Sequence, residues 1–259
     1  MNLQLNKNIT SNYKSNSQIA RVLTEDWVKN NSYCLICGKP YLCEFENNKP
    51  VADFFCDSCH EQYELKSKND THVGTHIVDG AYSTMIERIN SSTNPNFFFL
   101  TYNRTQMEVN NFLIIPKHYF ISDIIIKRRA LPSNARRAGW IGSIIDISKI
   151  PVNGKIFIIK DSKVVNKDKV LEKWKRTSFI KNKRTDSKGW ILDIMNCIDT
   201  IEDEHFSLKD MYKFENVLKL KYPNNHYIKD KIRQQLQVLR DKGLIDFLSR
   251  GNYKKLYST

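Results

Sequence analysis

Short apolar runs and amphipathic segments alternate along the first 160 residues of the chain. Residues 16–29 place apolar side chains such as Leu23 and Trp27 on one side of a helix, whereas NFFFLTY at 96–102 is typical of a buried strand. The pattern predicts helices at 16–29 and 79–90 and strands at 51–55, 63–68, 96–102, 111–115 and 155–160. Residues 121–126 are apolar but fit neither type, and residues 133–143 form a basic loop that contains glycine. Strands mixed with helices predict an α/β fold with a central sheet.

The pattern changes to helices towards the C-terminus. Residues 160–188 are dense in Lys, Asp and Asn apart from a weakly helical patch around Leu171 and Trp174, and residues 181–189 are interpreted as a linker. Helices are predicted at 190–201, 207–222 and 226–243, with Ser207 and Asp210 as a capping pair, and a hairpin at 244–257. These are the parts of a winged helix, so we expect two domains, residues 1–183 and 184–259.

Composition and charge narrow the class of partner. The chain has 259 residues, 41% of them hydrophobic, and a formal net charge of +13. Twelve basic residues against five acidic ones fall between positions 206 and 259. A surplus of this size points to a polyanion such as nucleic acid, although a merely basic proteome is the alternative. The polar N-terminus and the short apolar runs predict a soluble, cytoplasmic protein without a signal peptide or membrane span, in which cysteines stay reduced or bind metal.

Four of the six cysteines have the spacing of a zinc site. Two Cys-x2-Cys pairs lie 18 residues apart, and each pair on a tight turn can direct two thiolates at one point. A site of this kind is closed and structural because no position is left open for catalysis. We predict Zn²⁺ bound by Cys34, Cys37, Cys56 and Cys59.

The second cysteine pair lies between residues that suit phosphodiester hydrolysis. If Cys56 and Cys59 end a turn between antiparallel strands, Asp53 faces Gln62 and Glu64 is its diagonal neighbour. Side-chain alternation then places Glu64 and Lys66 on the same face as Asp53. Two carboxylates with the Leu65 main-chain carbonyl suit Mg²⁺, and Lys66 can orient or help deprotonate a water molecule. The alternative is an ordinary solvent-exposed hairpin without catalytic function, since Glu-x-Lys is a common sequence.

The same residues carry a resemblance to known nucleases. PVADF followed by ELKSK resembles the PD-(D/E)xK superfamily, with Val51 and Ala52 between the proline and the aspartate. Longer stretches, among them ARVLTEDWV, DGAYSTM, NPNFFFLTY, ARRAGWIG and NNHYIKDKIRQQLQVLRDK, resemble the DpnI-like methylation-dependent restriction endonucleases over nearly the whole chain. Residues 68–77, 161–185 and the last positions depart from that pattern.

The resemblance implies a PD-(D/E)xK core with a structural zinc and a C-terminal winged helix. It also implies Mg²⁺-dependent cleavage of GATC sites that carry N6-methyladenine, by a monomer. Asp53, Glu64 and Lys66 match the catalytic positions of the family, and the four cysteines match its zinc positions. A nuclease of other specificity, and a zinc-containing winged-helix regulator without activity, are the alternatives.

A protein that recognises a methylated base needs further residues that contact the DNA. N6-methyladenine shows a methyl group and one N–H in the major groove, so a reader needs an apolar wall and an acceptor. On the third tail helix, Arg233 is the candidate for guanine and Gln234 for adenine, whereas lysines contact phosphate. The full set of predicted DNA contacts is Arg136, Arg137 and Trp140 in the basic loop and His226, Lys229, Lys231, Arg233 and Gln234 in the tail.

Overall fold

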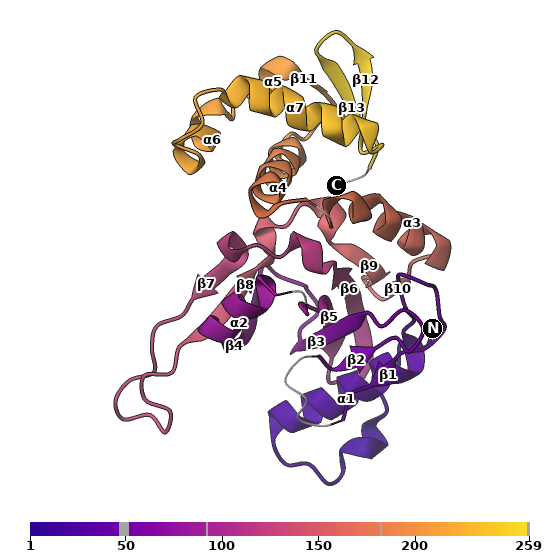
Figure 1. The fold of residues 1–259 in the computed structure, drawn as a ribbon. Helices are drawn as coiled ribbons and strands as arrows, with labels where there is room; N and C mark the ends of the chain where they lie inside the picture. Colours follow the sequence, from indigo (N-terminus) through magenta and orange to yellow (C-terminus); the bar gives the residue numbers. More distant parts are fainter. Residues whose placement is uncertain (47–51, 92, 182, 258–259) are drawn as a thin grey trace. The chain divides into compact units, whose positions relative to one another are not determined.

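The computed structural model describes residues 1–46, 52–91, 93–181 and 183–257. The chain divides into two compact units (Figure 1). Unit 1 comprises residues 1–148 and 154–175, and unit 2 comprises residues 149–153 and 176–259. No helix within the described ranges is long and apolar enough to cross a membrane.

A seven-stranded mixed sheet forms the centre of unit 1. Its strands lie in the order β1-β2-β3-β5-β6-β9-β10, and of these neighbours only β3 and β5 are parallel. Strand β5 is buried along almost its whole length, as its unbroken apolar run predicts. The strands span Cys43–Glu44 (β1), Phe54–Phe55 (β2), Gln62–Asn69 (β3), Asn96–Asn103 (β5), Glu108–Ile115 (β6), Ile156–Lys160 (β9) and Lys163–Val164 (β10).

Two helices contribute to the apolar cluster of this sheet. Helix α1 (Asn16–Asn31) directs Leu23 and Trp27 inwards, and the Trp27 ring meets Phe112 of β6 edge-on, with 5.3 Å between centroids. Helix α3 (Lys167–Thr177) adds Val170 and Trp174 to the cluster. Burial of large apolar side chains of this kind is the main stabilising term for the domain.

A second sheet of unit 1 holds the strands β4-β8-β7, all antiparallel. These strands span His76–Ala81 (β4), Gly142–Asp146 (β8) and Ile125–Lys127 (β7), and helix α2 (Tyr82–Ile89) follows β4 directly. The connection between β7 and β8 extends away from the rest of unit 1 (Figure 1). This connection is the predicted basic loop.

Unit 2 packs helices around α7 and beside a three-stranded antiparallel sheet, β11-β13-β12. Its apolar centre includes the buried side chains of Ile232, Leu236 and Leu239 of α7. Ser207 and Asp210 form the predicted capping box at the start of α5. The elements are α4 (Thr185–Thr200), β11 (His205–Ser207), α5 (Leu208–Tyr212), α6 (Glu215–Lys221), α7 (Ile228–Asp241), β12 (Ile245–Ser249) and β13 (Asn252–Lys255).

The mixed α/β class and most of the elements predicted from the sequence are confirmed, but several details are wrong. Residues 79–81 belong to strand β4, so the helix predicted at 79–90 starts later. Helix α4 begins inside the predicted linker, at Thr185. The helix predicted at 207–222 is split, because Lys213 and Phe214 donate to carbonyls three residues back and tighten the backbone. The strand predicted at 51–55 covers only Phe54–Phe55 among the described residues. The sequence also does not predict strands β1, β4, β8, β10 and β11. Val51 lies outside the described residues.

Candidate functional site

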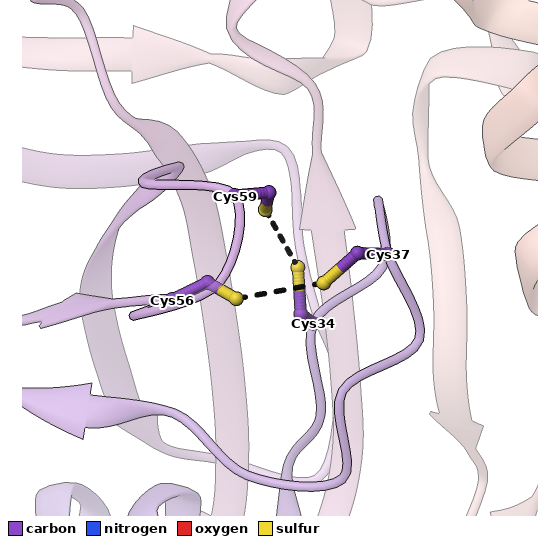
Figure 2. A group of neighbouring side chains, drawn as sticks. All are labelled: Cys34, Cys37, Cys56 and Cys59. Carbon is purple, nitrogen blue, oxygen red and sulfur yellow. Dashed lines mark hydrogen bonds between the residues drawn. The ribbon is translucent and has the colours of Figure 1, made fainter.

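The four predicted zinc ligands converge on one point (Figure 2). Their sulfur atoms all lie within 4.8 Å of one another, with 3.4 Å between Cys34 and Cys59 and 3.5 Å between Cys37 and Cys56. Zn–S bonds of about 2.3 Å in a tetrahedron place the sulfurs roughly 3.8 Å apart. The cluster therefore has the composition and the dimensions of a closed four-cysteine metal site. His60 lies outside it.

Each cysteine pair lies on a turn with the same backbone hydrogen bonds. Gly38 N–H donates to the Cys34 carbonyl and Cys34 N–H to the Lys39 carbonyl, both at 2.9 Å. The second turn repeats this pattern: His60 N–H donates to the Cys56 carbonyl and Cys56 N–H to the Glu61 carbonyl, both at 2.9 Å. The fifth residue of each turn is left-handed, with φ of 76° at Gly38 and 59° at His60. This conformation suits glycine and is uncommon for histidine.

Strand β3 contributes a hydrogen-bond donor to the cluster. The hydroxyl oxygen of Tyr63 lies 3.1 Å from the Cys34 sulfur, and both residues are fully buried. Burial raises the pKa of Tyr63 well above its ordinary value, with Cys34 adding to the effect, so the phenol stays neutral and can donate. Burial also raises the pKa of the Cys34 thiol. A metal cation bound at the cluster would offset this cost of forming a thiolate.

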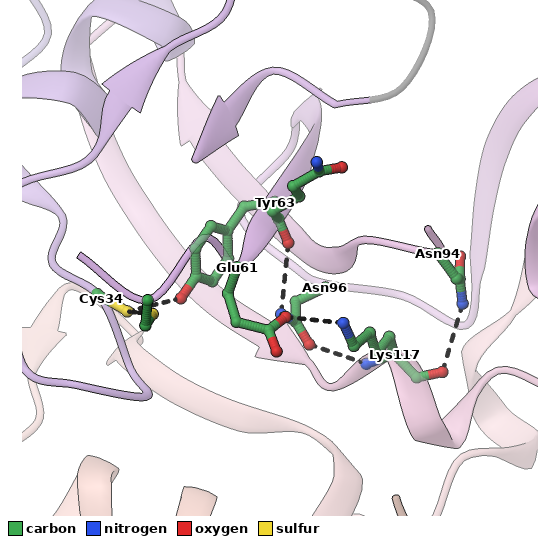
Figure 3. Close-up of polar contacts among 8 residues, drawn as sticks. Cys34, Glu61, Tyr63, Asn94, Asn96 and Lys117 are labelled. Atoms are coloured by element: carbon green, nitrogen blue, oxygen red, sulfur yellow. Dashed lines mark hydrogen bonds and ion pairs between the residues drawn. The ribbon is translucent and has the colours of Figure 1, made fainter. Parts of the chain in front are cut away.

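A polar network fixes the end of the same turn against β5 (Figure 3). Glu61 accepts from the Asn96 amide at 3.1 Å and from the Lys117 ammonium at 2.8 Å. Asn96 in turn accepts from the Lys117 backbone N–H at 3.1 Å. Buried polar groups are stabilising only when they are paired in this way, so the network specifies how the turn meets the sheet.

Asp53 lies closer to Glu64 along the hairpin than the sequence suggests. Phe54 pairs with Tyr63 and Phe55 with Gln62, so the predicted pairing of Asp53 with Gln62 is wrong. The left-handed backbone at His60 widens the turn. The Cys56 N–H therefore donates to the Glu61 carbonyl, and Cys56 does not lie opposite Cys59. As a result, the Asp53 carboxylate accepts the Leu65 N–H at 2.6 Å.

Glu64 and Lys66 share a face of β3, as their alternation predicts, and they meet two residues that sequence reasoning missed. The Lys66 ammonium lies 2.8 Å from Glu64 Oε1 and 2.6 Å from Asp79 Oδ1. Arg88 Nη1 lies 3.0 Å from Glu64 Oε2. Burial lowers the pKa of Lys66, but the two carboxylates raise it by more, and its net pKa lies above the ordinary value. Lys66 is therefore held as a cation.

Asp53 also lines a cavity of about 670 Å³. Glu25 of α1 lines the same cavity and is a further carboxylate that the sequence did not single out. Burial raises the pKa of Glu25 to about 7; Arg21 opposes this effect, whereas Asp53 and Glu44 add to it. A cavity lined by several carboxylates can accept a cation.

The predicted DNA contacts of unit 1 lie on the protruding basic loop. Arg136 and Arg137 are exposed, and Trp140 is half-buried with the Arg137 guanidinium 4.7 Å from its ring centroid. The Trp140 ring covers Gly142, where an added Cβ would lie only 2.8 Å from it. Trp140 thus lies at the base of the loop with one part of its surface available.

The predicted contacts of unit 2 are at or near the start of α7. His226, Lys229, Arg233 and Gln234 are exposed and Lys231 is half-buried. Some of these side chains have partners already: Lys229 pairs with Glu215 at 3.2 Å, and Arg233 pairs with Asp230 and donates to the Tyr212 hydroxyl. The ion pairs are exposed, so a DNA phosphate or base could replace them at little cost.

Two models of known protein families match the chain. A family model described as the Dam-replacing family (DpnI) matches residues 1–183, and a model described as the Dam-replacing HTH domain matches residues 186–255. The first match alone covers well over half of the chain. The chain belongs to the Dam-replacing, DpnI, family.

Proposed function

We propose that this protein is a type II, methyl-directed restriction endonuclease. It hydrolyses phosphodiester bonds of double-stranded DNA at GATC sites that carry N6-methyladenine, depends on Mg²⁺, and acts as a monomer. Membership of the DpnI family supports a restriction endonuclease with DNA as its partner. The observation that carries the catalytic part is that the Asp53 carboxylate accepts the backbone N–H of Leu65, the residue between Glu64 and Lys66, whose side chains form an ion pair on the same hairpin.

The hairpin offers ligands that suit a hard cation. Asp53, Glu64 and the main-chain carbonyl of Leu65 would supply oxygen ligands to Mg²⁺. The bound ion would lower the pKa of a water molecule and stabilise negative charge on the phosphate. The Leu65 N–H donates to Asp53 Oδ2 at 2.6 Å and so orients the Asp53 carboxylate.

Lys66 acts as a cation in this proposal. Its ammonium donates to carboxylate oxygens on both sides and keeps further donor capacity for a water molecule or a phosphate oxygen. A fixed positive charge next to the reacting phosphate stabilises the charge that develops in the transition state. The direction of its pKa favours this role over that of a general base.

The zinc ion is structural in this proposal. Cys34, Cys37, Cys56 and Cys59 would hold Zn²⁺ at the tip of the hairpin that carries Asp53 and Glu64. DNA contacts come from Arg136, Arg137 and Trp140 in unit 1 and from His226, Lys229, Lys231, Arg233 and Gln234 in unit 2. A helix-turn-helix domain reads the major groove with its recognition helix, for which α7 is the candidate.

The proposal is tested with one plasmid prepared with and without adenine methylation. We expect Mg²⁺-dependent cleavage of the methylated plasmid at GATC and none of the unmethylated one. Equal cleavage of both would favour a nuclease of other specificity, and specific binding without cleavage would favour a regulator.

Two variants test the site itself. Asp53→Asn should lower the cleavage rate by about 100- to 1000-fold, on the order of what loss of one group that stabilises transition-state charge costs. It should still bind methylated DNA and retain zinc. Asp168→Asn removes an exposed carboxylate from α3 and serves as the matched control. Full activity of Asp53→Asn would refute the catalytic assignment.

A further inference from the structure

Asp79 belongs to a different sheet from Lys66, and yet the two side chains form an ion pair of 2.6 Å. The Asp79 side chain is only 6% exposed. A buried carboxylate loses much of its hydration and is stable only with a close partner. Lys66 is the one ion-pair partner of Asp79 within the described ranges, so the cost of burying Asp79 is offset at this contact.

Two cations and two carboxylates alternate around this contact. Glu64 forms an ion pair with Arg88 through one carboxylate oxygen and with Lys66 through the other, and Lys66 also pairs with Asp79. A lysine side chain has many rotamers, and fixing one of them requires contacts at its charged end. Glu64 alone provides such a contact from the same strand, whereas Asp79 provides one from the neighbouring sheet.

The backbone explains how Asp79 reaches Lys66. Asp79 pairs with Ser143 and Ala81 pairs with Gly142, so Gly80 is an extra residue in β4. The Gly80 carbonyl accepts the Ser143 hydroxyl at 3.1 Å, which fixes the irregularity. Bulges of this kind redirect side chains and recur beside active sites.

We propose that Asp79 is a positioning residue that holds the Lys66 side chain beside Glu64 for the cleavage reaction. The inference rests on the proposed function, because it assigns Asp79 a part in the work of Lys66. Asp79 itself need not touch DNA. Displacement of a catalytic group by about 1 Å can cost on the order of 100-fold in rate, so a loose Lys66 would slow cleavage without weakening DNA binding.

The test measures single-turnover cleavage of a methylated GATC oligonucleotide by the full-length protein. We expect Asp79→Asn to lower the maximal rate about 10- to 100-fold, with the dissociation constant for DNA and the zinc content unchanged. Asp79→Glu should recover part of the rate, since it restores the carboxylate. Asp70→Asn is the matched control. Asp70 forms an ion pair of 2.6 Å with Lys68, which lies two residues after Lys66 in the chain. Removal of the Asp70 carboxylate should leave the cleavage rate within about twofold of the wild type.

A double-mutant cycle separates positioning from a general structural effect. In a Lys66→Gln background, Asp79→Asn should cause no further loss of rate, because the side chain that it positions is gone. An equal loss in both backgrounds, or a wild-type rate for Asp79→Asn, would overturn the inference.

A second readout does not depend on cleavage. Amine-reactive labelling followed by mass spectrometry should show that Lys66 reacts several-fold faster in Asp79→Asn, while Lys68 reacts at its wild-type rate. If the wild-type protein did not cut methylated DNA, the proposed function would fail, and the labelling ratio would still decide whether Asp79 holds Lys66. Unchanged labelling of Lys66 in a folded Asp79→Asn protein would count against the inference.

Discussion

Removal of one hydroxyl group, in Tyr63→Phe, tests whether the hairpin and the proposed zinc site at the cysteine cluster depend on each other. The Tyr63 hydroxyl lies 3.1 Å from the Cys34 sulfur in a fully buried setting. The ring itself is stacked on Phe98 with 4.8 Å between centroids, and phenylalanine preserves this packing. The substitution therefore removes one hydrogen bond and little else.

The expected cost follows from the kind of hydrogen bond. A hydrogen bond to a charged acceptor contributes about 1.5–3 kcal/mol net, and loss of a partner behind a metal ligand costs about 10- to 100-fold in metal affinity. Sulfur is a weak acceptor, and a zinc ion would share the thiolate charge, so we expect the lower half of this range. Tyr63→Phe should bind zinc about 10- to 30-fold more weakly than the wild type.

The measurement is a competition for zinc between the protein and a chromogenic chelator. Tyr33→Phe provides a matched control, because Tyr33 precedes Cys34, is almost fully buried, and has a hydroxyl without a hydrogen-bond partner within the described ranges. Its zinc affinity should stay within about twofold of the wild type. Cleavage by Tyr63→Phe should fall as zinc is withdrawn and return when zinc is added in excess. Equal zinc affinities for Tyr63→Phe and Tyr33→Phe would refute the reasoning.

Two further predictions concern the cavity and the basic loop. Burial raises the pKa of Glu25 from 4.5 to about 7, so the charged form is less stable in the folded than in the unfolded state. The resulting loss of folding stability grows from pH 4.5 to pH 7 and is complete above pH 7. In buffer without magnesium, Glu25→Gln should thus raise the free energy of unfolding in urea by up to about 3 kcal/mol at pH 8 and by less than about half of that at pH 5.5; an equal gain at both values would contradict this explanation. Trp140→Ala should weaken cleavage of methylated GATC and leave the zinc content intact, and unchanged cleavage would exclude a role for Trp140 in reading DNA.

Local patterns were sufficient for the longer helices, for the most buried strands and for the cysteine cluster. Two Cys-x2-Cys turns close on themselves, so their spacing alone indicates where four sulfurs meet. The apolar run of β5 predicts a buried strand, and Ser207 and Asp210 predict the capped start of α5. In each case the information lies within one turn, one strand or one helix.

Contacts between elements were the part that the sequence could not supply. Asp79 and Arg88 are 13 and 24 residues away from the partners they meet, and no period connects them to β3. The DGAYSTM stretch has helical character, but pairing with β8 draws its first residues into a strand. The predicted register around Asp53 is wrong because His60 adopts a left-handed backbone in the turn that carries Cys56 and Cys59. Histidine rarely adopts this conformation, so the sequence gives no sign of it.

The alternating charges around Glu64 have a consequence for when a metal ion can bind. In the folded protein both oxygens of Glu64 are already in contact with a cation, Arg88 on one side and Lys66 on the other. In the mechanism that we propose, magnesium has to compete with these two side chains for Glu64, so we expect the free protein to bind it weakly. A DNA phosphate would attract the same two cations and offer oxygen ligands of its own, which would release Glu64 for the ion. Affinity for the metal would then rise when DNA arrives, and the protein would stay catalytically silent between encounters with its substrate.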